Sequence, residues 1–287
     1  MSRIAVIQVP YHLGHEGRGM GAGPDALVDA GLAEALELGG HAVEVGRVER
    51  PDGQANEIGA SFAVLRAVAE HARTAVERGA FPLALAANCM TSVALVAALG
   101  RGVGVVWLDA HPDFNTTEGT TSGFADGMGL SILTGTGWDG LRATIPGYRA
   151  VPEEHVVLVG IRDVEPPERE RLDASSIAAL ALAELDGLEP ALDALRARVD
   201  EIHLHLDLDV LDPAEGRANE YAEEGGLTAD EVARTLDAVA ARFALSSAAI
   251  TAYNPAVDPD GRIPPIATAL AGRVAAAVGS RVPEPTA

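Results

Sequence analysis

Short apolar runs alternate along the chain with longer alanine- and leucine-rich stretches, and this alternation limits the fold more than any other feature. The apolar runs are predicted as strands at residues 3–9, 42–45, 82–87, 103–109, 154–160, 179–182, 201–207 and 248–253. Helices are predicted at residues 24–38, 58–78, 189–198, 228–241 and 266–278, with Thr228 and Glu231 forming a capping box. Strands that alternate with helices favour an α/β fold, a parallel sheet covered on both faces.

The chain has 287 residues, which is long enough to bury a sizeable core. Hydrophobic residues make up 48% and charged residues 22%, as in a globular protein rather than a disordered one. The sequence contains neither a linker rich in proline or serine nor an internal repeat. We therefore expect one domain over residues 1–287.

Acidic residues outnumber basic residues by 42 to 21, a net charge of -21, so nucleic acid and anionic membranes are not expected partners. The sequence contains no lysine, which excludes a Walker A lysine, a Schiff-base lysine and a Ser–Lys catalytic pair. A single cysteine, Cys89, excludes an intramolecular disulfide. The N-terminus lacks a signal-peptide pattern and the chain lacks a long apolar run, so a cytoplasmic location is expected.

Acidic side chains gather at the ends of two predicted strands. The segment VVWLDAHPDFN runs from an apolar strand into Asp109, His111 and Asp113. Residues i, i+2 and i+4 at a strand end project to the same side, so we expect these two carboxylates and the imidazole to converge. The segment HLHLDLDVLDP ends similarly with Asp207 and Asp209. So many carboxylates cannot be desolvated together without cations, and we predict a divalent metal site, plausibly binuclear.

Seven motifs occur in the order and at the spacing of one enzyme superfamily. They are MGAGPDAL, LDAHPDFN, TTSGFADGM, GIRDVEPPE, LDLDVLDP, GGLT and YNP. In these motifs the chain resembles the ureohydrolases, which include arginases, agmatinases and formimidoylglutamases. The resemblance implies a three-layer α/β/α fold with an eight-stranded parallel sheet. It also implies two Mn²⁺ ions per chain, with five of the usual six ligands at Asp109, His111, Asp113, Asp207 and Asp209.

Cys89 stands where the resemblance places the sixth ligand, which is a histidine in the family pattern Gly-Gly-Asp-His-Ser. Sulfur is a soft donor, so Cys89 favours Zn²⁺, Fe²⁺ or Co²⁺ over Mn²⁺ if it binds a metal. The alternative is a small buried apolar residue without a ligand role. A cysteine at this place is similar to one branch of the superfamily, the hydroxyarginine hydrolase of cycloserine biosynthesis.

Two further positions depart from the family pattern. Asp126 replaces the histidine that serves as proton shuttle, and it is interpreted either as an acid for the leaving amine or as a cap for a helix beginning at Gly127. Ala252 replaces a glutamate that pairs with a guanidinium. The missing carboxylate leaves a guanidine substrate in question, unless Asp126 takes over the pairing.

An outer substrate pocket is predicted from the resemblance. Asn115 and Ser122 occupy positions that hold an α-carboxylate, and Glu165 and Glu168 occupy positions that hold an α-amino group. Ordinary loop polarity is the alternative for all four residues. His203 and His205 alternate with leucines in their strand, and they are interpreted as core histidines, with support of the metal ligands as the alternative.

These patterns together predict a binuclear metal-dependent hydrolase that cleaves a linear C–N bond of a small amino-acid-like or amine substrate. The catalytic residues expected to handle protons are Asp113 and Asp126. Two alternatives remain, an amide hydrolase of the deacetylase kind with the same fold and a pseudoenzyme used for binding. The resemblance implies a homo-oligomer, a trimer or a hexamer.

Overall fold

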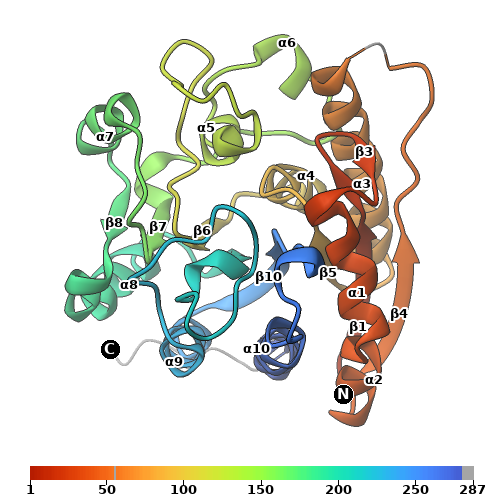
Figure 1. Ribbon diagram of the computed structural model, residues 1–287. Coiled ribbons are helices and arrows are strands. Elements are labelled where there is room, and N and C mark those ends of the chain that lie inside the picture. The colour runs from red at the N-terminus through yellow and green to blue at the C-terminus, as the bar shows by residue number, and fades with distance from the viewer. Residues whose placement is uncertain (55, 280–287) are drawn as a thin grey trace.

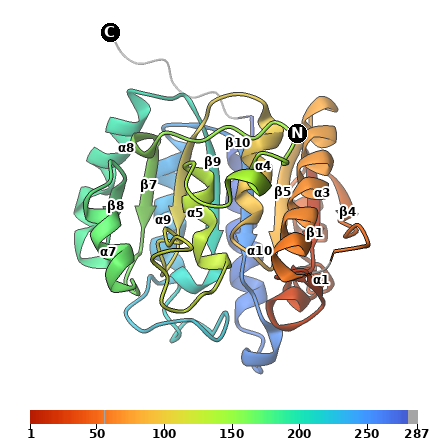
Figure 2. The same cartoon turned by 90° about the horizontal axis from the view of Figure 1, so that it is seen from above.

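A parallel sheet of eight strands forms the centre of the protein (Figure 2), seen in a computed structural model that describes residues 1–54 and 56–279. The strands are β1 (Arg3–Val9), β4 (Ala42–Arg47), β5 (Phe81–Ala86), β6 (Gly104–Leu108), β7 (Val156–Val159), β8 (Ala178–Leu180), β9 (Glu201–Asp207) and β10 (Ala244–Thr251). Their order across the sheet is β4-β1-β5-β10-β9-β6-β7-β8, and every neighbouring pair is parallel. A separate antiparallel pair is formed by β2 (Tyr11–His12) and β3 (His15–Glu16).

Helices cover both faces of the sheet, so the predicted three-layer α/β/α class is confirmed (Figure 1). One face carries α1 (Gly23–Asp29), α2 (Leu32–Leu38), α8 (Leu188–Arg196), α9 (Ala229–Ala240) and α10 (Ile263–Ala277). The other carries α3 (Glu57–Glu77), α4 (Thr91–Leu99), α5 (Gly129–Leu133) and α7 (Pro166–Asp173), with the short α6 (Asp139–Arg142) beside α3. Two buried apolar clusters fill the spaces between the sheet and these layers.

The predicted strands agree with the observed ones to within a few residues, and α9 begins after the predicted cap. The Thr228 hydroxyl accepts a hydrogen bond from the Glu231 backbone N–H, and the Glu231 carboxylate accepts one from the Thr228 backbone N–H. The single helix predicted at residues 24–38 is wrong. Gly31 has a φ of +92°, in the left-handed region, and this turn separates α1 from α2.

Helix α4 was not predicted, because its sequence lacks the period of a half-buried helix. Every one of its residues is buried, so no polar face marks it. It begins directly after the loop that carries Cys89 at the end of β5. The four adjacent strands β5, β10, β9 and β6 thus bring their carboxyl ends, and the residues that follow, to one edge of the sheet.

Among the described residues, no helix is long and apolar enough to cross a membrane. The domain predicted over residues 1–287 includes residue 55 and residues 280–287, which lie outside the described part of the chain.

Candidate metal centre and substrate pocket

A cavity of about 190 Å³ opens at the carboxyl edge of the sheet. Its walls include every side chain predicted for the site, namely Cys89, Asp109, His111, Asp113, Asn115, Ser122, Asp126, Glu165, Glu168, Asp207 and Asp209. Pockets at this edge are the usual ligand sites of parallel α/β sheets.

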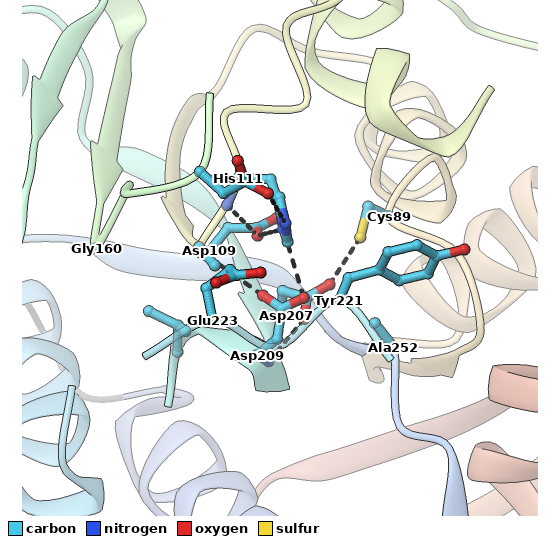
Figure 3. A network of polar contacts seen from close by, with 12 residues as sticks. Cys89, Asp109, His111, Gly160, Asp207, Asp209, Tyr221, Glu223 and Ala252 are labelled. Carbon is cyan, nitrogen blue, oxygen red and sulfur yellow. Dashed lines mark hydrogen bonds and ion pairs between the residues drawn. The ribbon is translucent and has the colours of Figure 1, made fainter. Parts of the chain in front are cut away.

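Two groups of ligand-type atoms lie in the cavity, and they share Asp109. In the first group, atoms of Cys89, Asp109, His205 and Asp207 all lie within 4.8 Å of one another. In the second group, atoms of Asp109, His111 and Asp209 meet the same limit. Figure 3 shows Cys89 and His111 on opposite sides of the aspartates. Two neighbouring groups with a common carboxylate are the arrangement that a pair of bridged cations requires.

Cys89 points its sulfur at the carboxylate of Asp207. The Sγ atom lies 2.9 Å from Asp207 Oδ2, and the Thr251 hydroxyl donates to the same oxygen at 3.1 Å. Burial raises the pKa of the Cys89 thiol well above its usual value, and the negative charge of Asp207 adds to this rise. Without a cation, the thiol is therefore protonated and donates to Asp207; a cation would instead stabilise the thiolate.

Asp109 is the most firmly held carboxylate of the cluster. The Trp107 indole N–H donates to Oδ2 at 3.0 Å, and the His111 backbone N–H donates to Oδ1 at 2.8 Å. Burial alone would raise the pKa of Asp109, but hydrogen bonds from His111 and His205 and the charge of His111 lower it overall. Burial would lower the pKa of His111, but the charges of Asp209 and Asp109 raise it to about 10. The metal-free cluster thus uses protonated His111 as a counter-ion.

The other aspartates are less fully compensated, although His111 also lies 3.5 Å from Asp209. Burial raises the pKa values of Asp113, Asp207 and Asp209, and nearby carboxylates raise them further. Asp113 Oδ2 is buried without a hydrogen-bond partner among the described residues. Such a set of repelling, partly unsatisfied oxygens fits divalent cations, which would neutralise the repulsion.

The convergence of Asp113 on the cluster does not come from strand alternation, and that part of the prediction is wrong. Strand β6 ends at Leu108, and Asp113 has a φ of +50° in a loop. The loop therefore turns Asp113 back toward the sheet edge.

Asp126 accepts hydrogen bonds from the segment that carries Cys89. Its Oδ2 accepts from the Asn88 side-chain amide at 2.6 Å and from the Cys89 backbone N–H at 3.2 Å, and its Oδ1 accepts from the Met90 backbone N–H at 3.2 Å. Asp126 therefore binds the segment that leads into α4, and it does not make the side-chain cap hydrogen bond to a helix at Gly127 that the capping alternative assumed. Burial raises its pKa to about 6 despite these hydrogen bonds.

The residues predicted for the outer pocket also line the cavity, with Asn115 and Glu168 buried and Ser122 exposed. Glu165 accepts from the backbone N–H groups of Thr121 and Ser122, and Glu168 accepts from the Phe114 backbone N–H at 2.7 Å. Asn115 Oδ1 is buried without a hydrogen-bond partner in the described part of the chain. Both glutamates thus support loops as well as line the cavity, and Asn115 Oδ1 remains available to a ligand.

Three polar lining residues were not predicted: Asp163, Asn219 and Tyr221. Asp163 faces His111 Nε2 at 3.5 Å. Asn219 donates to Asp209 Oδ2 and to the Ala252 carbonyl, both at 3.0 Å. Asp163 lies within the motif GIRDVEPPE, so the motif pointed to it, whereas Asn219 and Tyr221 lie in a loop without such a signal.

The wall around Ala252 is apolar. Ala252 is buried and clusters with Met20 and Ala87, and Phe124 packs against them. The ring of Phe124 in turn lies 5.2 Å from that of Tyr221. Ala252 thus brings an apolar side chain, and no carboxylate, to this part of the cavity wall.

The two histidines of β9 differ in their surroundings. His203 bonds to Ser247 and is a core histidine, as predicted. His205 is equally buried, but its Nε2 lies 3.8 Å from Asp109 Oδ2 and 3.4 Å from Thr251 Oγ1. Burial lowers the pKa of His205, so the contact with Asp109 joins a neutral imidazole to a carboxylate.

Comparisons with known proteins agree with this geometry. A family model described as the arginase family matches residues 2–278. The chain is 32% identical to an arginase of Bacillus caldovelox, over 95% of this chain and 97% of that protein. The crystal structure of arginase from Bacillus cereus has a TM-score of 0.87 and 29% identity, with 96% of this chain and 98% of that one covered.

A more distant structure, the formimidoylglutamase of Bacillus subtilis, shares the fold with a TM-score of 0.76 at 16% identity, over 96% of this chain and 87% of that one. The likeness to the cycloserine branch stays a prediction. Because the match extends over almost the whole chain and the sheet edge carries the expected cluster of ligand-type side chains, this chain belongs to the arginase family of metal-dependent hydrolases.

Proposed function

We propose that the protein is a binuclear metal-dependent hydrolase that cleaves a linear C–N bond of a guanidine, an amidine or a related group. The observation that carries the proposal is the pair of ligand groups that share Asp109 inside one cavity. Asp113 lines the same cavity, and its Oδ2 has no hydrogen-bond partner among the described residues, so we propose it as a further ligand. When bound, two divalent cations would polarise the substrate and lower the pKa of a water molecule.

The chain's own residues then have separate tasks. The aspartates and His111 hold the cations, with Cys89 as the sulfur ligand on one side. Asp126 lines the cavity with a pKa of about 6, which suits a group that gives a proton to a leaving amine near neutral pH. Asp113 is the second candidate for proton handling.

The cofactor we propose is two Mn²⁺ ions per chain, by resemblance to the family. Because Cys89 offers a soft sulfur donor, Zn²⁺, Fe²⁺ or Co²⁺ is the alternative for the ion beside it. The substrate is a small amine or amino acid, because the mouth of the cavity offers Asn115 and Ser122 to a carboxylate and Glu165 to an amino group. Glu168 lines the same cavity.

A second candidate is amide hydrolysis, and the apolar wall at Ala252 favours it. A neutral carbonyl group needs no counter-charge there, whereas an unpaired guanidinium would lose roughly 3–5 kcal/mol, the cost of breaking a buried pair.

The first test is metal content by elemental analysis of protein purified without chelator. About two ions per chain support the binuclear proposal. No bound ion, even after incubation with Mn²⁺, Zn²⁺, Fe²⁺ or Co²⁺, favours a binding protein without catalysis.

The loaded protein is then assayed with arginine, agmatine, formiminoglutamate and an N-acetylated amine. Urea or ammonia as product supports the first candidate, and acetate supports the second. Light scattering on the same sample tests the proposed homo-oligomer.

A further inference from the structure

We propose that His205 is a metal ligand, and that its Nε2 atom binds the cation held beside Cys89. The inference rests on the metal site of the proposed function, but not on the reaction or the substrate. Without His205, the first group would consist of one sulfur and carboxylates only, whereas the second group already contains the imidazole of His111.

The distances around His205 Nε2 fit a bound cation. Ligand atoms around a tetrahedral cation with bonds of about 2.0–2.3 Å lie about 3.3–3.8 Å apart. His205 Nε2 lies 3.8 Å from Asp109 Oδ2, and its group, with Cys89 and Asp207, fits within 4.8 Å. A small contraction around an ion would bring all four side chains to bonding distance.

The ring of His205 is already held in a binding orientation. Its Nδ1 atom lies 2.8 Å from Ser92 Oγ, and its plane stacks on Trp107 with centroids 3.6 Å apart and an angle of 15°. If Nδ1–H donates to the serine hydroxyl, the lone pair of Nε2 points to the carboxylates. Metal-binding histidines commonly use their other nitrogen as a donor in this way.

His203 provides a comparison within the same strand. It precedes His205 by two residues on the same face of β9, is also fully buried, and also contacts a serine hydroxyl, Ser247 Oγ at 2.8 Å. Its Nε2 has no hydrogen-bond partner among the described residues and belongs to neither ligand group. Burial and a serine contact are therefore not enough to place an imidazole at the cluster. His205 reaches the cluster because it lies near the carboxyl end of β9, two residues before Asp207.

The proposed ligand changes the metal preference of the first site. A set of one sulfur, one imidazole nitrogen and carboxylate oxygens suits Zn²⁺, Co²⁺ or Fe²⁺ better than a set of oxygens alone. The two sites would then differ, with the softer ion beside Cys89 and His205.

The experiment loads the wild type, His205→Asn and His203→Asn with Co²⁺ and measures metal stoichiometry, affinity and absorption. Asparagine can replace the Nδ1 contact to serine but has no atom in the place of Nε2. We expect two ions per chain in the wild type and in His203→Asn. In His205→Asn, we expect at least tenfold weaker binding of one ion and a shifted thiolate–cobalt absorption band.

The ligand role would be overturned if His205→Asn bound two ions with an affinity within twofold of the wild type and had an unchanged spectrum. A measurement on the unaltered protein guards against a variant that fails to fold. Proton NMR of the Co²⁺-loaded wild type should show two strongly shifted exchangeable imidazole resonances, one from His111 and one from His205. Only one such resonance would also overturn the inference.

These outcomes separate the inference from the proposed function. If the wild type binds two ions and shows two shifted resonances but turns over none of the assayed substrates, His205 is supported as a ligand and only the proposed reaction is overturned. A wild type that takes no ion at Cys89 would overturn both.

Discussion

The carboxylate of Asp126 lies 3.2 Å from the backbone nitrogen of Cys89, although 37 positions separate the two residues. Through this contact and its bonds to Asn88 and Met90, Asp126 holds the segment that presents the thiol to the metal cluster. A residue expected to move protons is therefore also a positioning residue for a candidate ligand.

Substitutions of Asp126 should separate the two roles. Asp126→Asn keeps an oxygen for Asn88 and Cys89 but cannot release or take up a proton, so we expect a loss of about 1 kcal/mol in stability and a fall in kcat of ~100-fold or more. Asp126→Ala leaves three donors without their acceptor and should lower the free energy of unfolding by about 2–4 kcal/mol. Urea unfolding and steady-state kinetics measure the two effects. A kcat within twofold of the wild type in Asp126→Asn would exclude the proton role.

Cys89→His should increase the affinity for Mn²⁺ by about tenfold or more and reduce the preference for Zn²⁺, because imidazole is the harder donor. Cys89→Ser serves as a control that keeps the size but removes the soft donor. Isothermal titration with each metal measures the change. If neither substitution alters metal content or affinity, Cys89 is a buried apolar residue and not a ligand.

Ala252→Glu should restore a counter-charge for a guanidinium and lower its Kd or KM by tenfold or more, a gain of about 1.4 kcal/mol. Ala252 has a φ of +62°, so any side chain placed there shares the same backbone strain. Ala252→Gln is thus a matched control with the same size and strain but no charge. Equal effects of the two substitutions would show that the missing carboxylate does not set the substrate preference.

Glu168 should make the metal-free protein less stable as the pH rises. Burial raises its pKa from 4.5 to about 7 in the folded state, so folding favours the protonated form, and this stability is lost as the pH rises from about 4.5 through 7. Glu168→Gln mimics the protonated form and keeps the acceptor for Phe114. It should match the wild type at pH 4 and exceed it by roughly 2–3 kcal/mol above pH 7.

Glu165→Gln serves as the control, because we expect it to change the stability in the opposite direction from Glu168→Gln. Hydrogen bonds from Thr121 and Ser122 lower the pKa of Glu165, although burial opposes them. The ionised form therefore stabilises the fold above the usual pKa of a glutamate, and its replacement should reduce stability at neutral pH. Thermal unfolding in the presence of a chelator, from pH 4 to 8, measures both variants. Parallel curves for all three proteins would contradict the assignment.

Features that depend on local patterns could be predicted from the sequence. Alternating apolar runs located the strands, the pair Thr228 and Glu231 located the start of α9, and strand ends followed by carboxylates pointed to the cluster of candidate metal ligands. These inferences succeed because a strand's burial pattern, a helix cap and the polarity of a strand end all depend on residues within a few positions of one another.

The contacts between residues far apart in the chain could not be predicted in this way. Helix α4 is buried on all sides, so its sequence lacks a polar face that would mark it. Asp126 reaches Cys89, and His205 reaches Asp109, only because β5, β9 and β6 lie close together in the sheet. Strand order and register arise from packing between segments far apart in the chain, and a local pattern does not contain that information. For the same physical reason, the difference between His203 and His205 became visible only when the neighbouring strands were in place.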